Sequence, residues 1–147
     1  MAKKILIMGL PGAGKTTLSK YLVEAIAAVP VNADKVRQEA NDWDFSLEGR
    51  RRQAKRMKEL SNLHIAQGKN VVADFICPTE DTRKDFDADF IVWVDTIKKG
   101  RFDDTNILFE PPTNYDFKVT TQDGKYWSEK ISKIILNDKK ILKKNET

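Results

Sequence analysis

The chain has 147 residues, 40% of them hydrophobic, which suits one domain over residues 1–147 and leaves little room for two. Its 26 basic and 22 acidic residues are intermixed and give a formal charge of only +4, so an anionic small molecule is favoured at least as much as a nucleic acid. The single cysteine, Cys77, excludes an internal disulfide, and no stretch approaches the roughly 20 apolar residues of a membrane-spanning helix, so a reducing, cytoplasmic setting without a membrane partner is expected.

The predicted elements alternate between strands and helices along the chain. The predicted strands cover residues 3–9, 29–34, 70–78, 89–96 and 117–121. The predicted helices cover residues 14–28, 46–69 and 128–142. This alternation predicts an α/β fold in which a parallel sheet is flanked by helices on both faces. Ligands bind to such sheets beyond the carboxyl ends of the strands, where Gly12, Asp34 and Asp74 fall.

A glycine-rich loop connects the first strand to the first helix. Residues 9–16, GLPGAGKT, match the pattern G-x-x-x-x-G-K-[ST], in which backbone N–H groups and the start of the helix hold the phosphates of a nucleotide. Lys15 is expected to reach the outer phosphates of ATP, and Thr16 to supply a hydroxyl ligand to Mg²⁺. A flexible turn with a chance lysine is the alternative, and the strand before and the helix after argue against it. The residues predicted to bind the nucleotide are Gly9, Pro11, Gly12, Ala13, Gly14, Lys15, Thr16 and Thr17.

The class of phosphate chemistry is indicated by what accompanies this loop. A switch GTPase would usually carry a guanine-reading N-K-x-D segment, and the chain has none, which leaves a small kinase as the leading class. Asp34, at the predicted end of the second strand, can accept the proton of an attacking hydroxyl or hold magnesium through water. Its alternative role is to cap a helix that begins at Lys35, and the two roles are compatible. Lys15 and Asp34 are the predicted catalytic residues.

Six segments in a fixed order carry a resemblance to one kinase family. GLPGAGKTT is similar to G-L-S-G-A-G-K-S-T, NADKVR to D-G-D-N-V-R, and FSLEGRRRQAKR to F-S-x-x-D-R-x-x-N-I-R-R. Further on, VVADFICP is similar to an apolar strand ending in F-I-S-P, FIVWVDT to F-I-E-V-Y-V-D-T, and RFDDTNILFEPP to F-T-G-I-D-S-P-Y-E-A-P. From residue 5 to about 120 the chain thus resembles the adenylylsulfate kinases, which phosphorylate the ribose 3'-hydroxyl of adenosine 5'-phosphosulfate (APS) with ATP.

The resemblance implies a three-layer P-loop kinase fold and a set of acceptor residues. Phe45 and Phe102 would stack on the two faces of the acceptor's adenine. Arg37 and Arg50 would neutralise the phosphosulfate, and Gln53 stands where the family has asparagine. The residues expected to bind the acceptor are Asp34, Arg37, Phe45, Arg50, Gln53, Phe75, Ile76 and Phe102.

Three departures from the family pattern have consequences. Cys77 replaces the serine of F-I-S-P, so no phosphorylated intermediate is expected on that residue, and Asn32 replaces the first aspartate of D-G-D. The long basic lid after V-D-T is reduced to IKKGR, where Lys98, Lys99 and Arg101 either cover the phosphates or are solvated. Because a shorter lid excludes water less completely, it predicts slower transfer or a looser substrate preference.

The sequence therefore predicts an adenylylsulfate kinase that uses ATP and Mg²⁺ and transfers the γ-phosphoryl group to APS, giving PAPS. The alternatives are a kinase for a polynucleotide 5'-hydroxyl or another small acceptor, and a nucleotide-binding switch protein without efficient transfer. A small molecule is expected as the partner ahead of nucleic acid. A homodimer is compatible with the sequence.

Several residues remain open between a functional and a packing role. Asp74 is expected either to organise the magnesium water shell or to contact the acceptor. The basic run 51–58 is expected mainly as a solvated helix face. His64 and the tryptophans Trp43, Trp93 and Trp127 are expected to be packing residues, with Trp43 the only tryptophan near the acceptor site.

Overall fold

Five parallel strands form one sheet in the computed structural model, in the order β2-β3-β1-β4-β5. The structure describes residues 2–100, 105 and 108–137. Within these residues the strands are β1 (Lys4–Met8), β2 (Ala28–Asn32), β3 (Asn70–Asp74), β4 (Phe90–Val94) and β5 (Phe117–Val119). Because β1 is the central strand, the loop that follows it opens in the middle of the sheet edge.

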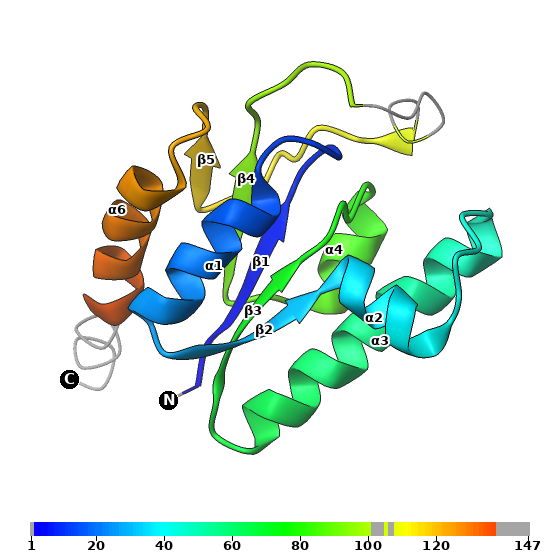
Figure 1. Cartoon of the computed structure of the whole chain (residues 1–147), viewed down its shortest axis with the longest axis horizontal. Helices are drawn as coiled ribbons and strands as arrows, with labels where there is room; N and C mark the ends of the chain where they lie inside the picture. Colours follow the sequence, from blue (N-terminus) through cyan, green and yellow to red (C-terminus); the bar gives the residue numbers. More distant parts are fainter. Residues whose placement is uncertain (1, 101–104, 106–107, 138–147) are drawn as a thin grey trace.

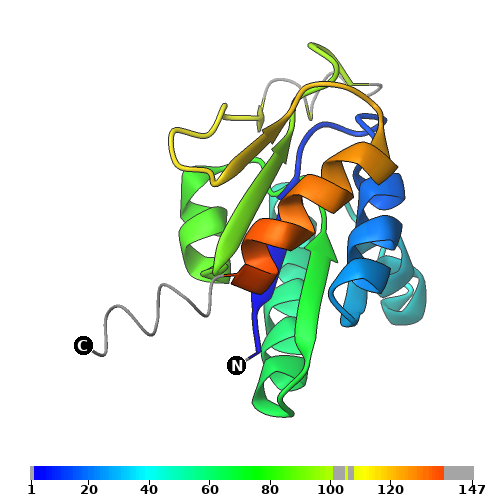
Figure 2. The same cartoon turned by 90° about the vertical axis from the view of Figure 1, so that its left-hand side faces the viewer.

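Helices cover both faces of the sheet, as Figures 1 and 2 show. The helices are α1 (Lys15–Ala25), α2 (Ala33–Ala40), α3 (Leu47–Ala66), α4 (Glu80–Phe86) and α6 (Gly124–Asn137). In β1, Ile5 and Ile7 point to the face covered by α1 and α6, whereas Leu6 and Met8 point to the face covered by α2, α3 and α4. All four side chains are fully buried, which is the pattern of a strand inside a three-layer protein. The expected α/β fold is confirmed.

The start of α2 differs from the sequence-based expectation. β2 ends at Asn32 rather than at Asp34, because the Asn32 side chain accepts a hydrogen bond from the Lys35 N–H (3.0 Å) and caps the helix. Asp34 therefore lies in the first turn of α2, and both its expected place at the strand end and its alternative role as N-cap are wrong.

Other boundaries differ as well. β3 ends at Asp74 rather than at residue 78. Helix α2, expected only as an alternative from Lys35, begins at Ala33, and the short helix α4 was not predicted. Helix α6 begins at Gly124 rather than at residue 128, and its expected end at residue 142 lies outside the described residues.

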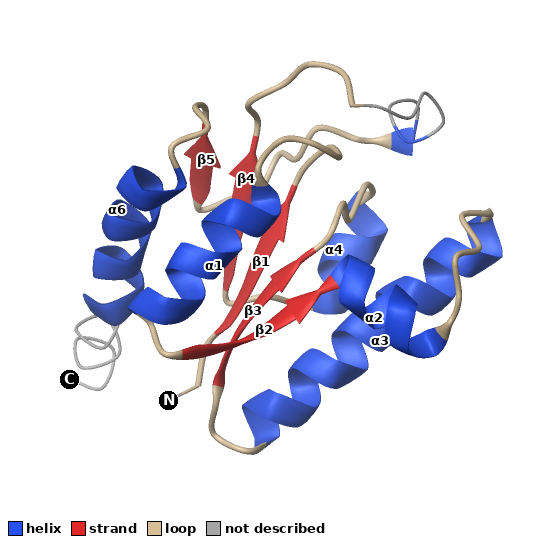
Figure 3. Ribbon diagram, in the orientation of Figure 1, coloured by secondary structure: helices blue, strands red, loops and turns tan. Residues whose placement is uncertain are grey.

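The strands all point to one edge of the sheet, as the arrowheads in Figure 3 show. Asp74 ends β3 there, and its register partners are Ile7 of β1 and Asn32 of β2. The phosphate loop, the start of α2 and the end of β3 therefore meet at this edge. Among the helices in the described ranges, none is long and apolar enough to cross a membrane.

Candidate functional site

A cavity of about 860 Å³ lies at the carboxyl edge of the sheet. It brings together most of the residues that the sequence singled out for the nucleotide and for the acceptor. The predicted site residues that line it are Pro11, Gly12, Gly14, Lys15, Thr16, Thr17, Asp34, Arg37, Phe45, Arg50, Gln53, Phe75 and Ile76. Gly9 and Ala13 are not in its lining, and Phe102 lies outside the described residues.

The phosphate loop leaves β1 through tightly packed backbone. A Cβ atom on Gly9 would stand 2.5 Å from the carbonyl oxygen of Val94, so only glycine fits at this position. Gly14 has a φ of 102° and precedes α1 without a side-chain cap. An uncapped helix start binds phosphate through its N–H groups and the positive end of its dipole. The Thr96 hydroxyl donates to the Ala13 carbonyl (2.7 Å) and supports the loop.

Two long side chains lie against this loop. Lys15 donates from Nζ to the Leu10 carbonyl (2.9 Å), and a phosphate oxygen can accept the same proton in place of that carbonyl. Gln122, in the connection between β5 and α6, donates from Nε2 to the Gly12 carbonyl (3.2 Å) and to the Thr96 hydroxyl (3.3 Å). Gln122 could not be identified from the sequence, because no local pattern links it to a loop 110 positions earlier in the chain.

A buried carboxylate lies beside Thr16 in the cavity wall. Asp74 accepts a hydrogen bond from the Thr16 hydroxyl (3.0 Å), and its two oxygens accept from Asn32 Nδ2 at 3.1 and 2.9 Å. Asp74 is only 3% exposed, and burial raises its pKa to about 6. The hydrogen bonds from Thr16 and Asn32 and the charge of Lys15 oppose this rise in pKa.

The Thr16 hydroxyl and the Asp74 carboxylate have the donor chemistry that Mg²⁺ prefers. Magnesium takes hard oxygen ligands, usually one or two from protein, with the rest from water and phosphates. The described part of the chain holds no group of three or more His, Cys, Asp or Glu side chains that could hold a metal ion. The donor set therefore fits a cation that is bound jointly with a nucleotide.

Asp34 offers an exposed carboxylate to the same cavity as Lys15. Gln53 in α3 donates from Nε2 to the Ala33 carbonyl (2.9 Å), so α3 fixes the start of α2 next to Asp34. Gln53 Oε1 is buried and has no hydrogen-bond partner within the described residues. A carboxylate placed in this way can accept the proton of a hydroxyl group bound in the cavity.

Arg37 and Arg50 both lie near the ring of Phe45. The Arg37 guanidinium carbon lies 4.3 Å from the ring centroid and that of Arg50 lies 5.9 Å away. Arg37 is buried, which lowers its pKa, and it donates to two carbonyl groups in segment 42–44. Arg50 donates to the Phe45 carbonyl (2.9 Å) and to the Thr105 hydroxyl (3.2 Å). Both guanidinium groups are thus fixed cations in the cavity wall.

The segment after β3 completes the wall. Phe75 is 6% exposed and packs edge to face on Phe86, with 5.4 Å between the ring centroids, so most of this side chain belongs to the core. Ile76 is half-buried beside it. Cys77 is buried, and burial raises its pKa to about 12. A neutral, buried thiol is a poor nucleophile.

The tryptophans divide into two groups. Trp93 packs against Tyr115 and Trp127 against Tyr126, each edge to face, which agrees with the expected packing role. Trp43 is 51% exposed, so its expected packing role is wrong. It lines the cavity and the other two tryptophans do not, which agrees with its expected place near the pocket.

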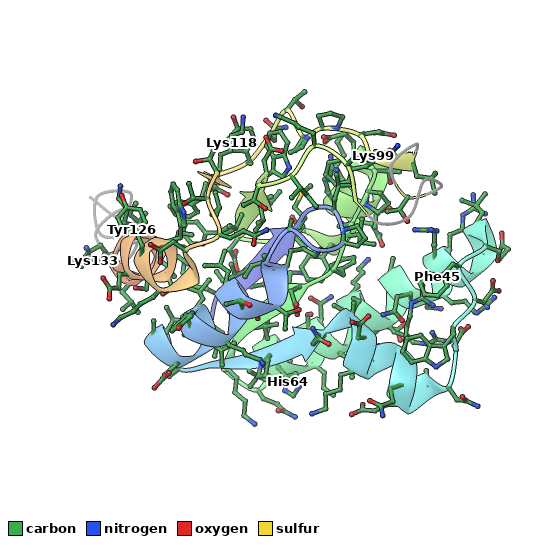
Figure 4. All side chains as sticks on the ribbon, turned by 45° about the horizontal axis from the view of Figure 1, so that its top comes forward. Phe45, His64, Lys99, Lys118, Tyr126 and Lys133 are labelled. Carbon is green, nitrogen blue, oxygen red and sulfur yellow. The ribbon has the colours of Figure 1, made fainter. Side chains whose placement is uncertain are left out.

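The short connection after β4 carries the lysines that were expected near the phosphates. The Lys98 side chain is 95% exposed, with its Nζ 3.9 Å from Asp95. Figure 4 shows Lys99 on this connection and Phe45 on the segment before α3. Lys98 and Lys99 are absent from the cavity lining, and Arg101 lies outside the described residues.

Comparisons with known proteins agree with this architecture. A family model described as AAA domain matches residues 5–90. The comparison with curated proteins gives no match. The chain is similar to the APS kinase of Mycobacterium tuberculosis in complex with AMPPNP and APS, with a TM-score of 0.69 and 18% identity over 91% of this chain and 97% of that chain.

Other solved structures with the same fold are kinases for different substrates. The shikimate kinase of Acinetobacter baumannii in complex with shikimate gives a TM-score of 0.63 at 19% identity, over 95% of this chain and 96% of that chain. A gluconokinase of Sinorhizobium meliloti 1021 gives 0.57 at 13% identity, over 91% of this chain and 95% of that chain. At these identities the likeness shows the fold, that of P-loop kinases, and not the substrate.

Proposed function

The chain belongs to the AAA domain family, and from this premise and the geometry of its cavity we propose that it is an ATP-dependent phosphotransferase for a hydroxyl group of a small anionic acceptor. One observation carries the proposal: the phosphate loop with Lys15 and the exposed carboxylate of Asp34 line a single cavity. A site for a polyphosphate and a base for a hydroxyl then share one space. Phosphoryl transfer needs mainly such positioning together with charge neutralisation.

The donor side of the proposed site is the phosphate loop. The backbone of residues 9–17 and the ammonium group of Lys15 bind the outer phosphates of ATP. Thr16 and Asp74 hold Mg²⁺, which when bound neutralises phosphate charge. Asn32 holds the Asp74 carboxylate in place through two hydrogen bonds.

The proposed transfer step uses Asp34 and Lys15. Asp34 takes the proton of the acceptor hydroxyl while the hydroxyl oxygen attacks the γ-phosphorus. A bond forms between these two atoms, the bond from the phosphorus to the bridging oxygen breaks, and ADP leaves. Lys15 stabilises the negative charge on the transferred group.

The finer proposal is that the acceptor is APS and that the product is PAPS. Arg37 and Arg50 supply two fixed cations for the phosphosulfate, and Phe45 supplies a ring for the adenine. Gln53 lines the same cavity, and its hydrogen bond to the Ala33 carbonyl fixes the start of α2 there. The resemblance implies Phe102 as the second stacking ring, and this residue lies outside the described residues. Similarity to an APS kinase bound to AMPPNP and APS supports this assignment, although shikimate kinase and gluconokinase share the fold.

An acceptor panel tests both levels of the proposal. Purified protein is incubated with magnesium ATP and, separately, with APS, shikimate, gluconate or an oligonucleotide with a free 5'-hydroxyl, and ADP and phosphorylated products are measured. We expect the highest kcat/KM with APS. Transfer to another acceptor but not to APS would overturn the finer proposal alone. ATP binding without transfer to any acceptor would overturn the phosphotransferase and leave a nucleotide-binding switch.

A further inference from the structure

The segment 41–46 between α2 and α3 exposes two large aromatic side chains to the cavity. Trp43 is 51% exposed and Phe45 is 50% exposed, and both line the cavity. Burial of apolar surface stabilises a protein by roughly 25 cal/mol per Å², and an exposed ring lacks this stabilisation. Trp43 and Phe45 are two positions apart and face one cavity, so a ligand with an apolar or aromatic surface can bury both rings.

Arginine side chains hold this segment from the side of α2 and α3. Arg52 donates to the carboxylates of Asp42 (3.0 Å) and Asp44 (2.8 Å), and Arg56 donates to Asp42 (2.6 Å). Arg37 donates to the backbone carbonyls of the same two residues, at 3.0 and 3.2 Å. The residues on both sides of Trp43 are thus fixed through side chain and main chain.

Local turns tighten the segment further. The Asp42 carboxylate accepts from the Asp44 N–H (3.1 Å), and the Asp44 carboxylate accepts from the Ser46 N–H (2.9 Å). Ser46 in turn caps α3 by accepting from the Gly49 N–H (3.2 Å). Because the backbone that carries both rings is fixed before a ligand arrives, binding orders less of the main chain and costs less entropy.

The surroundings of the two rings differ. Phe45 is stacked with the Arg37 guanidinium at 4.3 Å. In the part of the chain that the structure describes, the Trp43 indole has no hydrogen bond, ring contact or cation contact. Trp43 therefore has ring surface to offer to a ligand, beside two arginines that attract an anion.

We propose that Trp43 is a specificity-determining residue of the acceptor site, whose indole stacks on a planar ring of the acceptor. This inference rests on the proposed function and narrows its substrate class to anionic acceptors that carry an aromatic base. Sugar acids and alicyclic acids offer no such ring, so the indole cannot favour them. A planar base has two faces, so this inference gives one of them to Trp43, in place of the Phe102 that the resemblance implies, and leaves the other to Phe45.

The kinetic test compares Trp43→Ala and Trp43→Phe with Leu47→Ala. Leu47 is a matched control, because it is a 59% exposed apolar residue four positions away that is not in the cavity lining. We expect Trp43→Ala to raise KM for APS by about 5- to 160-fold, the range of a lost base stack of about 1–3 kcal/mol, with KM for ATP unchanged. Trp43→Phe should recover most of the loss, and Leu47→Ala should match wild type. An unchanged KM for APS in Trp43→Ala would overturn the proposal.

A binding test separates this inference from the proposed function. With ADP at saturation, AMP and ribose 5-phosphate are titrated while tryptophan fluorescence is recorded for wild type and Trp43→Phe. We expect AMP to quench a signal that Trp43→Phe lacks, and ribose 5-phosphate to leave it unchanged. This result without phosphoryl transfer would support the stack and reject the kinase. Absence of quenching, or equal quenching by ribose 5-phosphate, would reject the stack even if APS is phosphorylated.

Discussion

Asp34 and Asp81 occupy the same position in two short helices. Each is the exposed second residue after an N-cap, in α2 and α4 respectively, but only Asp34 lines the large cavity. Asp81→Asn is therefore a matched control, because it removes the same charge from the start of a helix. We expect Asp34→Asn to lower kcat by about 100-fold or more, the usual effect of losing a general base, with KM for ATP unchanged. Equal kcat values for the two variants in steady-state assays would contradict the role of Asp34.

Asp74 makes stability depend on pH. Burial raises its pKa from 3.8 to about 6 in the folded protein, so the unfolded chain releases this proton first as the pH rises. The free energy of unfolding therefore falls as the pH rises from 3.8 to about 6, and the full loss of stability is present above about pH 6. Asp74→Asn lacks the titration, so its free energy of unfolding relative to wild type should rise by about 2 kcal/mol between about pH 4 and pH 8. Urea unfolding of metal-free protein measures this, and parallel pH profiles would contradict it.

Segment 41–46 depends on a glycine in the first turn of α3. A Cβ atom on Gly49 would lie 2.0 Å from the Asp44 carbonyl oxygen. Alanine gains about 1 kcal/mol of helix propensity, whereas forcing extra volume into packed structure costs about 1–3 kcal/mol. Arg37 and Arg52 both bind Asp44, so its backbone cannot easily move away from the new Cβ atom. We therefore expect the cost of the clash to exceed the gain in helix propensity.

The expected result of Gly49→Ala is a net loss of about 1 kcal/mol in the free energy of unfolding, with weaker binding of APS and unchanged binding of ATP. Glu48→Ala, at an exposed neighbour in the same turn, serves as the control. Urea unfolding and equilibrium titrations provide both measurements. A stabilised Gly49→Ala variant would show that segment 41–46 moves at little cost.

The elements that the sequence predicted are those with long or strongly apolar patterns. β1 and the 20-residue α3 are of this kind. Helices α2 and α4 have 8 and 7 residues, too few for a periodic pattern to stand out. A capping signal was present for α4, where Thr79 precedes Glu80, and it is the signal that could have found this helix. At Asn32 the side-chain cap ends the strand, a local effect that β propensity does not register.

The site as a whole combines local motifs with long-range placement. The phosphate loop could be predicted because its function lies in consecutive residues. Thr16 and, in one of its two expected roles, Asp74 were expected at the magnesium site. Their hydrogen bond could not be predicted, because it requires β3 to lie next to β1, and strand order is a property of the complete sheet. Gln122 is a further case, since its contact with Gly12 depends on the packing of β5 and α6. The resemblance gathered Arg37, Phe45, Arg50 and Gln53 into one site, and these residues do line one cavity.

The connection after β4 is where the whole molecule departs most from the adenylylsulfate kinases. Where that family has a long basic lid, this chain has IKKGR, and its Lys98 extends into solvent. Water exclusion strengthens the electrostatic stabilisation of phosphoryl transfer and prevents hydrolysis of ATP. The cavity should therefore admit water more readily than one closed by a long lid.

This geometry predicts a measurable ATPase activity in the absence of acceptor. A barrier to water that is lower by only about 1.4 kcal/mol raises hydrolysis about tenfold. We therefore expect the ratio of hydrolysis to transfer to be about tenfold higher than in a long-lid adenylylsulfate kinase assayed alongside. Asp34→Asn removes the proposed base and separates ATP hydrolysis from phosphoryl transfer. The rate of hydrolysis by water in the cavity should fall less in this variant than the rate of transfer to APS. Equal ratios in the two enzymes would mean that other residues exclude water as well as the long lid does.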